Sequence, residues 1–118
     1  MKAYYKVVRI DLTSCYAEGK AKVEYKIGKY VYAPYWLPEI HKVLFVFDSL
    51  HFAKRFIGLM PVPSGIEVYE CRVKGIENYL PRYLEISYLA DGKIVFWSSY
   101  FPSGTKAVRE VKLVRKIT

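Results

Sequence analysis

Asp48 and Ser49 stand between an apolar run and a cationic stretch, in the order strand, polar turn, helix that can cradle a phosphate. Such a cradle needs backbone amides that converge on the start of the helix, and glycine lets a backbone come that close. The segment "FDSLH" contains no glycine. Asp48 or Ser49 instead suits the N-cap of a helix that packs on a sheet, with His51, Lys54 and Arg55 on its solvated face. The stretch is therefore predicted to be structural.

The histidines and cysteines do not predict a metal site. His41, His51, Cys15 and Cys71 lack the closely spaced pairs that are typical of zinc ligands. A Cys–His nucleophile pair cannot be read from the sequence either, because neighbours in space need not be neighbours in the chain. We interpret both cysteines as core residues and leave a disulfide between them open. The sequence thus predicts no metal and no cofactor.

Positive charge gathers at the two ends of the chain. The net charge is +8, and residues 1–29 and 106–118 each carry an excess of +4, whereas residues 30–105 are neutral. Because the termini of a domain often lie close together, the two ends could form one basic face that binds DNA or RNA. The alternative is that these cations only keep solvated strand faces soluble. The candidate nucleic-acid-binding cations are Lys20, Lys22, Lys26, Lys29, Lys106, Arg109, Lys112, Arg115 and Lys116.

Tyrosines follow the first cationic segment directly. Tyr30 and Tyr32 share one face of a predicted strand, and Tyr35 and Trp36 come next. Aromatic rings beside basic side chains can hold single-stranded nucleic acid by stacking and charge. The alternative is ordinary packing of tyrosines in a sheet or between subunits. Tyr30 and Tyr32 join the candidate nucleic-acid-binding residues, although no named nucleic-acid motif accompanies them.

These side chains must be positioned by a sheet of short strands and one helix. Alternating or apolar runs predict strands at 3–10, 21–27, 30–33, 43–47, 66–74, 82–90, 93–99 and 107–117, and an amphipathic helix at 49–57 that ends at Gly58. The alternation places Val23, Tyr25 and Ile27 on the buried face of one strand and Tyr69, Cys71 and Val73 on the core face of another. The apolar run at 43–47 is typical of a central strand covered on both faces. Gly28-Lys29 and Asp91-Gly92 are predicted as two-residue hairpin turns. The second turn pairs Ala90 with Lys93, Ile86 with Trp97 and Glu85 with Ser98.

The predicted fold is α+β: a mostly antiparallel, twisted sheet of about six to eight strands with one packed helix, 49–57. Its 118 residues form a single domain, 1–118. No apolar run is long enough to span a membrane, and the start "MKAYYKVVRID" lacks the apolar core of a signal peptide, so we expect an intracellular protein without membrane contact. The Lys, Tyr and Val richness suggests a thermophilic source.

Four segments carry a resemblance to known proteins. They are "KVVRIDLTS", "LFVFDSLHFAKRF", "IEVYECRVKG" and "VKLVRKI". Together they resemble a group of small uncharacterised proteins from phages, archaeal viruses and their hosts. The resemblance covers most of the chain and implies no biochemical activity.

A thinner resemblance connects Arg9, Ser98, Ser99 and Glu110, in that order, to ADP-ribosyltransferase-like folds. It implies an arginine that holds the phosphate of NAD, a serine that braces the nicotinamide side and a glutamate that stabilises the developing cation. The sequence departs from the family at "WSSY", which lacks the three-residue serine motif, and at "VREVK", which lacks the usual second polar residue two positions before the glutamate. Glu110 also shares a strand face with Lys112, so an exposed ion pair explains it without catalysis.

We therefore expect a small non-enzymatic binding or accessory protein that contacts DNA or RNA through a basic face. Two alternatives stay open: a protein-interaction module that acts on a host or viral partner, and an NAD-dependent transferase. Pairing of an exposed strand such as "AKVEYKI" with a second copy would give a homodimer, whereas the lysines on that strand oppose it.

Overall fold

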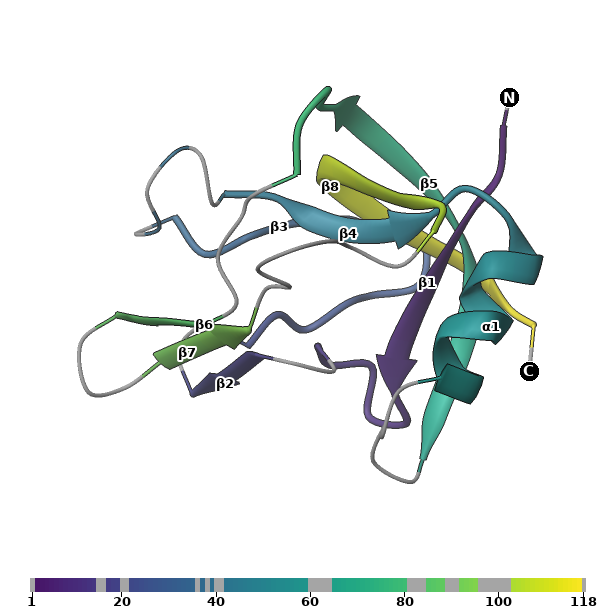
Figure 1. The fold of residues 1–118 in the computed structure, drawn as a ribbon, viewed down its shortest axis with the longest axis horizontal. Coiled ribbons are helices and arrows are strands. Elements are labelled where there is room, and N and C mark those ends of the chain that lie inside the picture. Colours follow the sequence, from purple (N-terminus) through teal and green to yellow (C-terminus); the bar gives the residue numbers. More distant parts are fainter. Residues whose placement is uncertain are drawn as a thin grey trace.

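A computed structural model describes residues 2–14, 17–19, 22–35, 37, 39, 42–59, 65–80, 85–88, 92–95 and 103–117. The elements follow the chain in the order β1 (Tyr4–Arg9), β2 (Ala17–Gly19), β3 (Tyr30–Tyr32), β4 (Leu44–Phe47), α1 (Leu50–Leu59), β5 (Ile66–Ile76), β6 (Glu85–Tyr88), β7 (Gly92–Val95) and β8 (Thr105–Lys116). One helix therefore accompanies the strands in the described part of the chain (Figure 1).

Five strands form a small barrel, which the long strand β8 closes. The strand order is β3-β8-β4-β1-β5, and β5 pairs with β8 as well as with β1. The 12 residues of β8 are enough for one edge to pair with β5 while the other edge pairs first with β4 and then with β3. All of these ladders are antiparallel. In Figure 1, β5 runs from the lower right to the top of the molecule, β8 lies beside its upper part, and β4 and β3 lie beside β8.

The mixed α+β class, the mostly antiparallel pairing and the single helix are confirmed, but a sheet of six to eight strands is wrong. The main sheet has five strands, and β2, β7 and β6 form a separate three-stranded sheet in that order. Alternation of polar and apolar residues indicates that a strand has one buried face, and it contains no information about which sheet the strand joins. The closure of β8 onto β5 depends on pairing between distant parts of the chain.

Two apolar cores lie on the two sides of the main sheet. Val8 and Val46 point into the barrel, where they pack with Val108, Val111 and Leu113. The other core lies between the sheet and α1, and its buried members are Val7, Phe47, Ala53, Phe56 and Val68. Consecutive residues of a strand point to opposite faces, so Val7 and Val8 serve different cores. Strand β4 also contributes to both, as predicted for an apolar central strand.

Helix α1 has the predicted N-cap and the predicted buried face. The Ser49 hydroxyl accepts a hydrogen bond from the Phe52 amide at 3.2 Å. Ala53 and Phe56 are buried, whereas His51, Lys54 and Arg55 are exposed. The helix continues through Gly58 to Leu59 instead of ending at the glycine. In Figure 1 it lies to the side of the barrel, against β1.

The first predicted turn is shifted by one residue. Lys26 bridges Lys29, so the central residues of the turn are Ile27 and Gly28 and not Gly28 and Lys29. Gly28 has φ +80°, which a type II turn requires at its second central position. The shift moves Ile27 out of the strand, and its side chain is 57% exposed instead of buried. Val23 and Tyr25 are buried as predicted.

The second hairpin exists with a different register. Ile86 pairs with Ile94 rather than Trp97, Glu85 with Val95 rather than Ser98, and Lys93 with Ser87 rather than Ala90. Gly92 belongs to β7, where it pairs with Tyr88 and also with Gly19 of β2. The register of the β6–β7 hairpin therefore also depends on β2, and the sequence of the turn contains no information about that third strand.

Candidate functional site

The two cationic segments of the chain lie side by side on the barrel. Ile27 forms a parallel bridge with Leu113, and the Gly28 amide donates to the Leu113 carbonyl at 2.8 Å. Farther along, Tyr30 pairs with Lys112. The side chains of Lys22, Lys26, Lys29 and Lys106 are exposed, and Lys20 lies outside the described residues. The turn at 26–29 thus brings part of the first basic segment against β8.

Three of the candidate cations on β8 form ion pairs. Arg115 Nε donates to Glu70 Oε1 at 3.0 Å, and Lys116 Nζ lies 2.7 Å from Glu67 Oε2. The hydrogen bond to Glu67 raises the pKa of Lys116 above its ordinary value. Arg109 is the third, and its contacts are more extensive. These partners neutralise part of the positive charge that the sequence places on β8.

Arg109 connects three segments of the chain. Its Nε donates to Glu77 Oε2 at 2.7 Å, and its Nη1 donates to the carbonyls of Glu39 and Lys42 at 3.0 and 2.8 Å. Nη2 donates to the Tyr79 hydroxyl at 3.3 Å. The hydrogen bond to Glu77 raises the pKa of the guanidinium further above its already high value. Arg109 therefore has a structural role, which leaves little of its guanidinium for a ligand.

Tyr30 is the centre of a second group of cations. Lys74 Nζ lies 4.2 Å from the centroid of the Tyr30 ring, and Lys112 Nζ lies 5.0 Å from it. Across the β3, β8 and β5 ladders, Tyr30 is in line with Lys112 and Arg72. The next row, two residues along, contains Tyr32, Glu110 and Lys74. Residues two apart on a strand share a face, so both rows lie on one side of the sheet.

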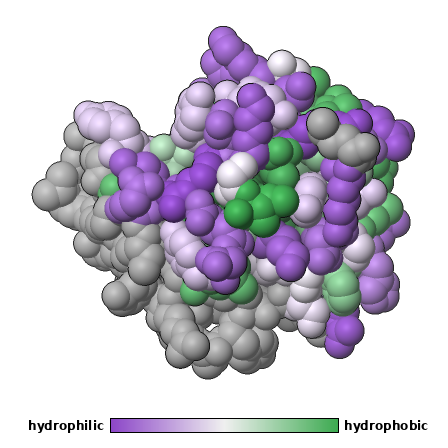
Figure 2. Space-filling model, turned by 90° about the horizontal axis from the view of Figure 1, so that it is seen from above, coloured by the Kyte–Doolittle hydropathy of each residue, from purple (hydrophilic) through white to green (hydrophobic). Residues whose placement is uncertain are grey.

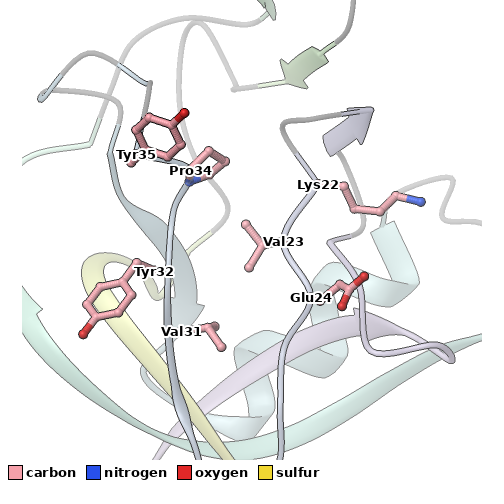
Figure 3. A pocket seen from close by; sticks show the side chains of 7 residues that line it. All are labelled: Lys22, Val23, Glu24, Val31, Tyr32, Pro34 and Tyr35. Atoms are coloured by element: carbon pink, nitrogen blue, oxygen red, sulfur yellow. The ribbon is translucent and has the colours of Figure 1, made fainter.

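An open groove lies beside β3, where the first hairpin opens out (Figure 3). Its volume is about 320 Å³, and its lining residues are Lys22, Val23, Glu24, Val31, Tyr32, Pro34 and Tyr35. Val23 and Val31 lie between the two segments, whereas Lys22 and Glu24 point away on one side and Tyr32 on the other. Tyr32 is 64% exposed and Tyr35 is 87% exposed. The groove therefore has an apolar floor and a rim of aromatic and charged residues.

The groove stays open because residues 22–25 pair on their other side. The Ser14 amide donates to the Val23 carbonyl at 3.1 Å, and the Val23 amide donates to Ser14 Oγ at 3.0 Å. The Tyr25 amide donates to the Leu12 carbonyl. Between the described segments 22–26 and 29–35, the bridge at Lys26 and Lys29 is the single point of pairing. Proline has no amide hydrogen, so Pro34 cannot continue the ladder of β3.

Figure 2 shows the molecule from above, relative to the view of Figure 1. Hydrophilic residues cover much of the described surface on this side. This view looks onto the part of the molecule where the end of β5 and β8 lie. Hydrophobic residues form smaller areas between the hydrophilic ones. The hydrophilic residues therefore interrupt the apolar area of this surface.

The structure does not bring Arg9 and Glu110 together. Arg9 pairs with Ile66 at the start of β5, whereas Glu110 pairs with Lys74 near the end of the same strand. Eight steps of about 3.3 Å place roughly 26 Å of strand between those positions. Ser98 and Ser99 lie outside the described residues. Arg9 and Glu110 therefore lie near opposite ends of β5 in the part of the chain that is described.

Cys71 is a buried free thiol in the barrel core. Burial raises its pKa to about 12, so the thiol is neutral and shielded at ordinary pH. Cys15 lies outside the described residues. Within the described ranges, no three His, Cys, Asp or Glu side chains gather closely enough to hold a metal ion. The part of the chain that is described also contains no helix with the length and apolar character needed to cross a membrane.

Comparison with protein-family models, curated proteins and solved structures gave no match.

Sequence reasoning missed Lys74, which lies at the Tyr30 ring, and Arg72, which lies in the same row as Tyr30. The alternation of residues 66–74 placed Tyr69 and Cys71 on the core face, and both are buried. The same alternation puts Arg72 and Lys74 on the opposite face. That signal was present in the sequence, but the pairing of β5 with β8 was needed to connect it with Tyr30.

Proposed function

We propose that this protein binds single-stranded DNA or RNA, with little sequence preference, on the surface formed by residues 22–35 and the adjoining part of β8. The observation that carries the proposal is the pair of exposed rings, Tyr32 and Tyr35, on the rim of a groove that the exposed Lys22 also borders. Bases stack on exposed aromatic rings, and lysines beside them attract the phosphates.

The cations do not support the proposal equally. Lys22, Lys26 and Lys29 are exposed and follow one another along the segment that borders β3. Arg109, Arg115 and Lys116 form ion pairs with carboxylates, so their attraction for a phosphate is reduced. Of these pairs, those of Arg115 and Lys116 place the cation at the surface, so these two side chains can still attract a phosphate weakly. The proposal therefore gives the lysines at 22–29 and Lys112 the main role.

Shape favours a single strand over a duplex. A duplex buries its bases between two backbones, and exposed tyrosines then have no base to stack on. The described residues around the groove include no helix that would enter a major groove, since α1 packs against β1 and β4. Binding should therefore follow charge and stacking and depend little on sequence.

The test is a salt titration with the unmodified protein. Fluorescent single-stranded and double-stranded oligonucleotides of equal length are titrated by anisotropy between about 20 and 200 mM salt. The proposal expects tighter binding of the single strand and a log–log slope of about −0.7 for each phosphate that is neutralised. Absence of binding to both oligonucleotides at low salt would refute it.

A second candidate is a protein-interaction module. It is favoured by the apolar floor of the groove and by the exposed side chains of Ile27 and Tyr35, which could pack against an extended segment of a partner. Such binding is held by apolar contacts and backbone hydrogen bonds, so it should change little with salt. The titration above separates the two: a nucleic-acid binder loses affinity steeply as salt rises.

A further inference from the structure

Two lysines from different strands place their ammonium groups at one tyrosine ring. Lys74 comes from β5 and Lys112 from β8, and both lie within 5.0 Å of the centroid of Tyr30 on β3. Among the described residues, two other tyrosine rings have a lysine ammonium over them, and each has only one: Lys2 at Tyr4 and Lys6 at Tyr25. Tyr30 is therefore the point where positive charge is most concentrated around a ring.

The position of Lys74 is informative because it has a nearby carboxylate that it does not use. Its cross-strand partner on β8 is Glu110, the usual geometry for an ion pair in a sheet. Its ammonium lies instead at Tyr30, which is diagonal to it across β8. Among the residues that the structure describes, no carboxylate forms an ion pair with Lys74 or Lys112. Their charge is thus available, in contrast to that of Arg115 and Lys116 on the same sheet.

The Tyr30 ring attracts the ammonium groups of Lys74 and Lys112, and an anion bound between these groups would reduce their repulsion. The negative face of a tyrosine attracts ammonium groups, which explains how two like charges stay close. Their mutual repulsion remains, and it is relieved when an anion lies between them. Lysine binds phosphate as a point charge with three donors, so two lysines can contact different oxygens of one phosphate.

We propose that Tyr30, Lys74 and Lys112 form a subsite for one phosphate group. The inference rests on the proposed function, because it takes that phosphate to be a phosphodiester of the bound single strand. It also gives Tyr30 a different role from the two exposed tyrosines: Tyr30 positions the lysines, whereas Tyr32 and Tyr35 remain open for stacking. Glu110 lies in the neighbouring row and opposes the anion.

A phosphate group can come from a nucleic acid or from a small molecule, so the experiment uses both. The probes are a fluorescent single-stranded oligonucleotide, followed by anisotropy, and inorganic tripolyphosphate, followed by calorimetry. The test variant is Lys74→Gln with Lys112→Gln, and the matched control is Lys54→Gln with Arg55→Gln on the exposed face of α1. Both variants remove two positive charges, and unfolding temperatures verify that each remains folded.

The test variant should lower the magnitude of the salt slope for the oligonucleotide by about 0.7 to 1.4, equivalent to one or two phosphate contacts, while the control leaves it unchanged. Glu110→Gln should tighten binding, because it removes the opposing charge. Tyr30→Phe should keep the affinity, since its ring also attracts cations, whereas Tyr30→Leu should weaken it. These two substitutions test the positioning role of the ring.

The outcomes separate the subsite from the proposed function. Normal oligonucleotide binding with equal slopes for the test variant and the control refutes the subsite and leaves the function standing. Binding of tripolyphosphate that depends on Lys74 and Lys112, without oligonucleotide binding, keeps the subsite and refutes its assignment to a nucleic acid. Absence of binding to either probe refutes both.

Discussion

Gly75 of β5 lies so close to Arg109 of β8 that a β-carbon on the glycine would come within 2.7 Å of Arg109 Cγ. Gly75 also has φ +68°, a left-handed backbone that other residues rarely adopt. The glycine thereby leaves room for the arginine to cross the end of β5 and reach Glu77, Glu39 and Tyr79. A residue that we expected to bind nucleic acid is thus held in a cluster within the protein.

Replacing Arg109 should destabilise the fold. Arg109→Ala removes the hydrogen bonds to Glu77 and to two backbone carbonyls, and we expect a loss of about 1–3 kcal/mol in the free energy of unfolding. Arg115→Ala is the control, because its pair with Glu70 is exposed and should contribute about 0–1 kcal/mol. Urea unfolding of both variants measures the difference. Equal losses would show that the Arg109 cluster has no special structural role.

Gly104 should tolerate alanine less well than Gly28. Both have a positive φ, so alanine strains the backbone by about 1–2 kcal/mol at either position. A β-carbon on Gly104 also meets the Phe52 ring, whereas the space around Gly28 is open. We expect Gly104→Ala to cost about 2–5 kcal/mol in total. Thermal unfolding compares the two, and a greater loss for Gly28→Ala would contradict the packing of residues 103–104 on α1.

The apolar face of α1 should stabilise the protein mainly through Phe56. Its side chain is buried, and its ring centroid lies 5.3 Å from that of Phe47. Phe56→Ala should therefore cost about 3–5 kcal/mol, and Phe52→Ala should cost less because Phe52 is only partly buried. Lys54→Ala on the exposed face serves as the reference and should have little effect. Melting temperatures that are similar for the Phe56 and Lys54 variants would rule out the assignment of the buried face.

The Cys71 thiol should react slowly in the folded protein. Its pKa is raised to about 12 by burial, so very little thiolate is present at pH 8. A Cys15→Ser variant leaves Cys71 as the single thiol for a reaction with a disulfide reagent. We expect slow reaction in buffer and fast reaction in denaturant. Fast stoichiometric reaction of the folded protein would show that the thiol is not buried.

The raised pKa of Cys71 determines the direction in which stability changes with pH. In the unfolded chain the thiol ionises near pH 9, whereas in the folded protein it keeps its proton up to about pH 12. Between these values the unfolded state binds fewer protons, so this thiol lowers stability as pH rises from about 9 toward 12. In the Cys15→Ser background, Cys71→Ala should remove that part of the alkaline loss of stability, which urea titrations at pH 8 and 10 can measure.

Local features of the fold could be predicted from the sequence because short-range physics determines them. Ser49 caps the helix, Ala53 and Phe56 are buried, and Val23 and Tyr25 alternate with exposed neighbours. Features that depend on distant pairing could not be predicted. The closure of β5 onto β8 and the pairing of Gly19 with Gly92 join residues that are 32 to 73 positions apart in the chain, and no local pattern specifies such partners.

In the candidate site, too, only the local features could be predicted from the sequence. Charge counting located the basic segments, and strand alternation placed Tyr30 and Tyr32 on one face. Which cations are neutralised depends on partners from other strands, such as Glu77 for Arg109 and Glu67 for Lys116. Lys74 can reach Tyr30 only because a single strand, β8, lies between β5 and β3.

The most direct test of the central proposal is a comparison of two charge reversals of equal size. Lys22→Glu with Lys26→Glu alters the proposed surface, and Lys54→Glu with Arg55→Glu alters the exposed face of α1; each changes the net charge by the same amount. Anisotropy titrations with a single-stranded oligonucleotide at low salt then measure the affinity and the salt slope of each variant. We predict that the first variant loses affinity and has a flatter slope, while the second binds almost as well as the unmodified protein. Equal weakening by both variants would show that net charge alone drives binding and would contradict a binding surface at residues 22–35.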